Sequence, residues 1–250
     1  MDSKLNNASS QDDPESKAQA GRVAGTELVT TELVIFDFDG VVADSEVISL
    51  SELQKALHAF GVKMSVDEVR AKFLGSAINK IEAFLDTDST GKTSEGFARK
   101  WYDALFARFA KELTVMPGLI DLLDALDQRE VPYCIASGGS FERLGVALKA
   151  TLLTNRFKNR IFSADLVEHG KPAPDLFLHA AREMGASPEK CLVIEDSPAG
   201  IVAAKKAGMR ALGFVGGSHL KDRIEVHSKD LLLHRANRVM ARFNETLREL

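Results

Sequence analysis

Five short, continuous apolar runs with helical segments between them place the strongest constraint on the fold of this chain. The first run, residues 33–40 (LVIFDFDG), ends in acids and a glycine. The other runs occupy residues 131–139, 160–165, 190–196 and 210–217. A run without polar alternation indicates a strand that is buried on both faces, as in a parallel sheet covered by helices. The pattern therefore predicts an α/β fold with an open, mostly parallel sheet.

A long helical segment interrupts this alternation after the first strand. Residues 46–114 show no strand signal, and apolar residues such as Val47 and Leu50 recur at helical spacing. We therefore expect a small, all-helical second domain over residues 46–114. It would be inserted into an α/β core made of residues 31–45 and 115–250.

Residues 1–30 differ from both parts because they are polar and rich in Ser, Asp and Ala. This composition predicts a disordered tail. The tail lacks the basic start and apolar centre of a signal peptide, and its acids are unlike a transit peptide. No apolar run in the chain approaches the roughly 20 residues of a membrane span, so we expect no membrane partner.

Composition also narrows the partners and the compartment. The formal net charge of −4 argues against a nucleic-acid partner, because sequence-independent binding to nucleic acid needs a basic surface. Cys134 and Cys191 each lie in an apolar run, which predicts buried free thiols in a reducing compartment. We expect a cytoplasmic protein and favour a monomer.

Chemically useful residues follow the predicted strands at their carboxyl ends. In chain order they are Asp37, Asp39, Ser137, Gly138, Lys171, Glu195 and Asp196. Lys171 is expected in a loop just before a helix, and the others lie at strand ends. Ligands of open α/β sheets bind at this edge, so we expect all of these residues to face one crevice.

Four carboxylates in one crevice repel one another unless a cation lies among them. Carboxylate oxygens suit Mg²⁺, which commonly pairs with a substrate phosphate. The Ser137 hydroxyl, the Lys171 ammonium and the backbone N–H groups around Gly138 would bind phosphate oxygens. A carboxylate aimed at phosphorus can act as a nucleophile, and a second one can act as general acid and base. The cluster therefore predicts a magnesium site that acts on a phosphate ester.

Four segments resemble the motifs of the haloacid dehalogenase (HAD) superfamily in their order and spacing. They are VIFDFDGVVADS (34–45), IASGGS (135–140), GKPAPD (170–175) and VIEDSPAG (193–200). The resemblance extends over about residues 33–217. It is closest to the branch with phosphatases and β-phosphoglucomutase, in which a helical cap follows the first strand. It implies a Rossmann-like HAD core with a small helical cap domain.

The resemblance also implies a role for each residue of the crevice. Asp37 matches the nucleophile and a metal ligand. Asp39 matches the general acid and base, with its backbone carbonyl on the metal. Ser137 matches the phosphate-binding hydroxyl, and Lys171 matches the lysine that stabilises the nucleophile and the phosphoryl group. Asp196 matches the metal-binding acid of the last motif.

Other positions allow two interpretations. Glu195 matches a neighbour that assists the metal site indirectly, or it is a solvated acid at a strand end. Asp44 and Ser45 are expected to cap the first inserted helix, because both residue types are favoured there. Glu46 either reaches the mouth of the site or lies on a solvated helix face. His219 is expected at the surface or in the core, with a place near the crevice as the alternative.

Two reactions of a phosphorylated metabolite fit the motifs. Mutases of the resembled branch carry a His in the first cap helix and a basic residue after a glycine turn, which Ser49 and residues 72–80 match poorly. We therefore expect a Mg²⁺-dependent phosphatase that hydrolyses a sugar phosphate or sugar-acid phosphate through an aspartyl-phosphate. A sugar phosphomutase is the alternative. A non-catalytic binding protein is less favoured, because no motif residue is missing. The loop at residues 73–76 is expected to point into the crevice.

Two structures remain possible for residues 231–250. A short edge strand with a final helix is usual in the resembled family, and one long helix is the alternative. Residues 235–238 (RANR) contain no glycine that could form a turn before the strand, which makes the strand doubtful.

Overall fold

One parallel sheet forms the centre of the protein. The computed structural model describes residues 30–76, 78–87 and 93–250. The sheet has six strands in the order β3-β2-β1-β4-β5-β6, all paired in parallel. The strands are β1 (Leu33–Phe36), β2 (Tyr133–Ser137), β3 (Ile161–Ser163), β4 (Cys191–Glu195), β5 (Arg210–Phe214) and β6 (Arg238–Met240). This confirms the predicted open parallel α/β fold.

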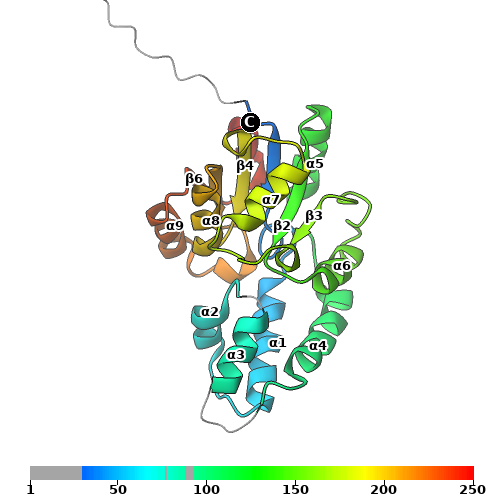
Figure 1. Ribbon diagram of the computed structural model, residues 1–250, viewed down its shortest axis with the longest axis vertical. Helices are drawn as coiled ribbons and strands as arrows, with labels where there is room; N and C mark the ends of the chain where they lie inside the picture. The colour runs from blue at the N-terminus through cyan, green and yellow to red at the C-terminus, as the bar shows by residue number, and fades with distance from the viewer. Residues whose placement is uncertain (1–29, 77, 88–92) are drawn as a thin grey trace, which may run out of the picture.

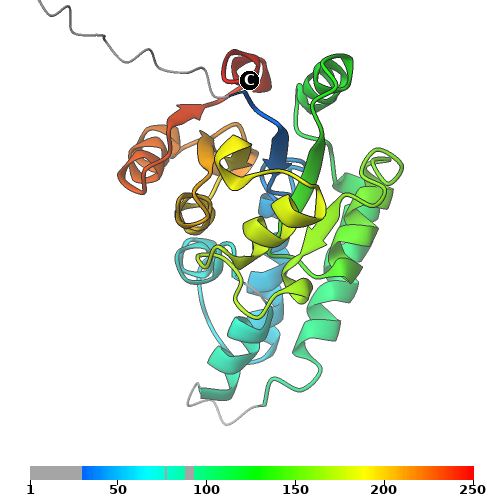
Figure 2. The same cartoon turned by 45° about the horizontal axis from the view of Figure 1, so that its top comes forward.

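Helices cover both faces of the sheet (Figures 1 and 2). Successive side chains of β1 point to opposite faces, so Val34 belongs to one core cluster and Ile35 to the other. The first cluster includes residues of α5 (Leu119–Gln128) and α6 (Phe141–Ala150). The second cluster includes residues of α7 (Asp175–Glu183), α8 (Pro198–Lys206) and α9 (Ile224–Leu233). Burial on both faces explains why the strand sequences are apolar without alternation.

Among the described residues, four helices lie between β1 and α5 and gather below the sheet in Figure 1. They are α1 (Glu46–Ala59), α2 (Val66–Phe73), α3 (Ile78–Thr87) and α4 (Phe97–Glu112). The segments that enter and leave this group run side by side, because the Asp44 backbone N–H donates to the Thr114 carbonyl at 3.0 Å. This placement agrees with an inserted helical cap, and the division into two domains stays a prediction.

The C-terminal segment corrects one expectation. Residues Arg238–Met240 form β6 beside β5, so the edge strand exists and the alternative of one long helix is wrong. Arg235 adopts a φ of 73° after α9 and makes the turn that we expected to need a glycine. The Asn237 side chain then accepts a hydrogen bond from the Ala211 backbone N–H at 2.9 Å. A 3₁₀ segment, Phe243–Arg248, follows the strand.

Three further predictions concern the cysteines, residues 1–30 and membrane spans. Cys134 and Cys191 are buried free thiols, as predicted, and burial raises the pKa of Cys191 to about 11. The predicted disorder of residues 1–30 concerns residues that, apart from Thr30, lie outside the described part of the chain. Among the described helices, none has both the length and the apolarity that a membrane crossing requires.

Candidate active site

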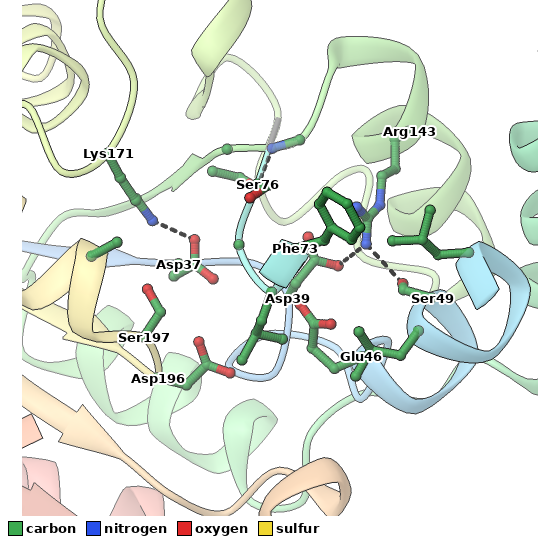
Figure 3. A pocket seen from close by; sticks show the side chains of 18 of the residues that line it. Asp37, Asp39, Glu46, Ser49, Phe73, Ser76, Arg143, Lys171, Asp196 and Ser197 are labelled. Carbon is green, nitrogen blue, oxygen red and sulfur yellow. Dashed lines mark hydrogen bonds and ion pairs between the residues drawn. The ribbon is translucent and has the colours of Figure 1, made fainter. Parts of the chain in front are cut away.

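The carboxyl edge of the sheet carries a cavity at the point where the strand order reverses around β1 (Figure 3). The cavity encloses about 720 Å³ of empty space, part of it continuous with solvent. Its walls include every residue that the sequence places in the crevice, namely Asp37, Asp39, Ser137, Gly138, Lys171, Glu195 and Asp196. The structure therefore brings all of these residues together, and their individual roles stay predictions.

Lys171 connects two carboxylates at the floor of the cavity. Its Nζ lies 2.5 Å from Asp37 Oδ1 and 2.7 Å from Glu195 Oε2. Burial disfavours the ammonium ion, but Asp37 and Glu195 outweigh it and hold the pKa of Lys171 above its ordinary value. Glu195 is buried and also accepts a hydrogen bond from Ser197 Oγ at 2.7 Å, so its interpretation as a solvated acid is wrong.

Three buried carboxylates form a group that fits a metal ion. Asp37, Glu195 and Asp196 each offer an oxygen, and these oxygens all lie within 4.8 Å of one another. Burial, followed by the charge of Glu195, raises the pKa of both Asp37 and Asp196 well above its ordinary value. A divalent cation would remove this repulsion, and an all-oxygen ligand set suits Mg²⁺. The cluster can therefore hold a metal of this kind.

Two glycines make room for the carboxylates. Gly40 has a φ of +76°, and a Cβ at this position would lie 2.0 Å from Asp196 Oδ2. A Cβ on Gly200 would lie 1.9 Å from the Glu195 carboxyl carbon. Side chains at either position would displace an acid of the site.

The turn after β2 is held by hydroxyl groups. The Gly139 backbone N–H donates to Ser137 Oγ at 3.1 Å, and Ser163 Oγ donates to the Gly139 carbonyl at 2.7 Å. Ser140 then caps α6 by accepting from the Arg143 backbone N–H at 3.3 Å. These bonds fix the turn and the N-terminus of α6 beside the cavity, the kind of backbone position at which proteins bind anions.

Asp39 is held on the side of the cavity that faces α1. Its carboxylate accepts hydrogen bonds from Ser45 Oγ and from Arg143 Nη2, the latter at 2.6 Å. Ser45 occupies the N-cap position of α1, but its side chain bonds to no helix N–H, and the Asp44 side chain accepts from Ser218 Oγ. The predicted capping by Asp44 and Ser45 is therefore wrong, because Asp39 and Ser218 bind these side chains.

Arg143 was not among the residues predicted from the sequence. This residue follows Ser140 in the first turn of α6 and is buried, with its Nη2 also 2.9 Å from Ser49 Oγ. Burial disfavours its charge, but Asp39 and Glu46 outweigh it and hold the pKa of Arg143 above its ordinary value. One sequence signal could have identified it: Arg143 lies four residues before the buried Ala147, on the apolar face of the helix that follows the IASGGS segment.

Glu46 and His219 both lie at the site. Glu46 is buried in the cavity wall, where burial and then the charge of Asp39 raise its pKa to about 8. His219 is buried with its Nε2 3.3 Å from Asp196 Oδ2, and burial lowers its pKa. The alternatives that placed these residues near the crevice are correct.

The loop at residues 73–76, which begins at the end of α2, forms the wall of the cavity on the side of the inserted helices. Phe73, Leu74, Gly75 and Ser76 line it, as expected, and Figure 3 shows the Phe73 ring beside Asp39 and Arg143. Lys72, which precedes this loop, is exposed and does not line the cavity. Its Nζ lies 3.9 Å from the ring centroid of Phe84. The wall contributed by this loop is mainly apolar or small.

Known proteins resemble this chain over most of its length. A 6-phosphogluconate phosphatase of Escherichia coli (strain K12) is 30% identical over 191 residues, which cover 76% of this chain and 85% of that protein. The fructose-1-phosphate phosphatase YqaB of the same organism is 31% identical over 180 residues, covering 72% and 94%. The chloroplastic protein SUPPRESSOR OF QUENCHING 1 of Arabidopsis thaliana is 30% identical over 207 residues, but the match spans only 19% of that protein.

Solved structures also resemble this chain over most of its length. A haloacid dehalogenase-like protein from Agrobacterium tumefaciens str. C58 has a TM-score of 0.71 and 33% identity, covering 87% of this chain and 96% of that one. A HAD family hydrolase from Deinococcus radiodurans R1, with bound phosphate and sodium, has a TM-score of 0.67 and 28% identity, covering 87% and 94%. Residues 31–208 match the haloacid dehalogenase-like hydrolase family itself. The chain therefore belongs to the haloacid dehalogenase-like hydrolases and is an enzyme of the hydrolase class.

Proposed function

We propose that the protein is a Mg²⁺-dependent phosphatase that hydrolyses a small phosphorylated metabolite, a sugar phosphate or a sugar-acid phosphate. The observation that carries this proposal is the arrangement of Lys171 between Asp37 and Glu195, with Asp196 beside them and Ser137 in the same cavity. This arrangement supplies a nucleophile, a cation and a hydroxyl around one position for a phosphoryl group.

The proposed reaction has two steps. Asp37 attacks phosphorus, the ester P–O bond breaks, and Asp39 gives a proton to the leaving oxygen. A water molecule then attacks phosphorus while Asp39 takes its proton, which releases phosphate and restores Asp37. Lys171 and Ser137 hold the phosphoryl oxygens throughout.

Asp37 and Asp196 would hold the metal, with the backbone carbonyl of Asp39 as the third protein ligand that the resemblance implies. Glu195 is better suited to support Lys171, because its Oε2 already accepts the Lys171 hydrogen bond. When bound, Mg²⁺ would neutralise negative charge on the phosphoryl group.

Hydrolysis is favoured over a mutase reaction by two observations. Ser49 stands where the mutase pattern expects a His, and its hydroxyl is bonded to Arg143 and to the Ser45 carbonyl. Two of the relatives are named as phosphatases of 6-phosphogluconate and fructose 1-phosphate. Both support a reaction in which water, rather than a sugar, receives the phosphoryl group.

The test is phosphate release from a panel of sugar phosphates and sugar-acid phosphates. We expect release to require Mg²⁺, to stop in EDTA, and to fall by about 10³-fold or more in Asp37→Asn, because the nucleophile is lost. Asp67→Asn on the exposed face of α2 is the matched control and should act like the wild type. Release by Asp37→Asn at the wild-type rate would contradict the proposal.

A further inference from the structure

Arg143 is a buried cation with more hydrogen-bond donors than partners. Only its Nη2 donates to side chains among the described residues, to Asp39 and to Ser49. Its Nε is buried and has no partner there. The guanidinium carbon also lies 6.0 Å from the ring centroid of Trp101 and 5.9 Å from that of Phe109. An arginine has five N–H donors, so this group retains capacity for a further acceptor.

A second unpaired donor lies in the same wall. Trp101 Nε1 is buried without a partner among the residues the structure describes. Trp101 and Arg143 line the active-site cavity and also an adjoining cavity that continues past Tyr102 to Asp165. A buried donor left unpaired costs about 1–3 kcal/mol, so the wall favours a ligand that brings acceptors.

The position of Arg143 relates it to the leaving group. In Figure 3 Lys171 and Arg143 lie on opposite sides of the pair formed by Asp37 and Asp39. If Lys171 and Asp37 hold the phosphoryl group, the rest of the substrate extends toward Asp39 and Arg143. In that arrangement Arg143 lies beside the part of the substrate that differs between metabolites.

We propose that Arg143 binds a carboxylate of the leaving group, so that the enzyme prefers phosphorylated sugar acids to neutral sugar phosphates. This inference rests on the proposed phosphatase function. A planar guanidinium matches a carboxylate in geometry and charge. The structure already shows this pairing, because the Asp39 carboxylate lies 2.6 Å from Nη2. When Asp39 turns to protonate the leaving oxygen, a substrate carboxylate replaces it.

Matched substrate pairs test this proposal. 6-Phosphogluconate and glucitol 6-phosphate differ only in a carboxylate against a hydroxymethyl group, and so do 3-phosphoglycerate and glycerol 3-phosphate. We expect the wild type to favour the acid by about tenfold or more in kcat/KM in at least one pair. In Arg143→Gln this preference should fall to about one, with Arg143→Lys in between.

A binding measurement separates recognition from positioning of Asp39. In the Asp37→Asn background, calorimetry with the acid and neutral members of each pair should show the same preference, and Arg143→Gln should abolish it. Arg108→Gln, which removes ion pairs with Glu112 on α4 and with Glu52 on α1 outside the cavity lining, is the control and should leave the preference unchanged. Equal turnover of both members by the wild type would overturn the proposal. So would an Arg143→Gln variant that weakens both members equally, since Arg143 would then only position Asp39. If no ester is hydrolysed by the wild type, the proposed function fails, and the calorimetric ratio still decides the role of Arg143.

Discussion

At the scale of single residues, Glu46 shows how the site affects stability. It lies in the first turn of α1, in a wall that it shares with Asp39 and Asp196. Its pKa is raised from 4.5 to about 8 by burial and by Asp39. The folded protein therefore binds this proton more tightly than the unfolded chain. Between these two pKa values the unfolded chain has lost the proton and the folded one keeps it, so stability falls as pH rises.

Glu46→Gln should remove this pH dependence. The whole change in pKa corresponds to at most roughly 5 kcal/mol. Between pH 5 and pH 8 the wild type should lose about 3–4 kcal/mol of stability relative to Glu46→Gln. Urea unfolding in EDTA at both values measures it. Glu225→Gln, on the exposed side of α9, is the control and should keep the wild-type slope. A Glu46→Gln variant with the same pH dependence as the wild type would refute this account of Glu46.

Gly40 allows a matched test of the metal cluster. Gly40→Ala should displace Asp196, since its Cβ would lie 2.0 Å from Oδ2, and should weaken Mg²⁺ binding by about 10–100-fold. Gly208→Ala is the control, because its φ of +77° is equally unfavourable for alanine and nothing lies within 4 Å of its Cβ. Calorimetric titration with Mg²⁺ compares them. Equal affinities in the two variants would show that Asp196 does not bind the ion.

At the scale of elements, the strands could be predicted and the final turn could not. The apolar runs identified β1 to β5 because each is buried between two helical layers. The absence of a glycine argued against β6. Arg235 nevertheless adopts the left-handed conformation, and the Asn237 side chain accepts a hydrogen bond from the Ala211 backbone N–H of β5. This turn depends on contacts with β5, which local sequence does not contain.

Asn237→Ala tests that explanation. The change leaves the buried Ala211 N–H without its acceptor and should destabilise the protein by about 1–3 kcal/mol. Asn237→Asp keeps an acceptor oxygen and should cost less. Thermal unfolding compares the two variants. Equal melting temperatures for Asn237→Ala and Asn237→Asp would mean that the side-chain bond does not stabilise β6.

At the scale of the whole molecule, the site depends on segments far apart in the chain. The residues at strand ends could be predicted because parallel strands bring their carboxyl ends to one edge. Arg143 and the contacts of Ser45 could not, because they depend on how α1 and α6 pack against Asp39. The sequence therefore located the chemistry of the phosphoryl group, while the environment of the leaving group required the folded structure.

In the proposed reaction Asp37 carries the phosphoryl group during turnover. The most direct test is an acid-quenched reaction of the wild-type enzyme with Mg²⁺ and a ³²P-labelled sugar-acid phosphate, followed by analysis of the protein. We expect label on the protein that hydroxylamine releases, as for an acyl phosphate, and that is absent in Asp37→Asn. Steady phosphate release with no labelled protein at any quench time, or equal labelling of Asp37→Asn, would contradict this role of Asp37.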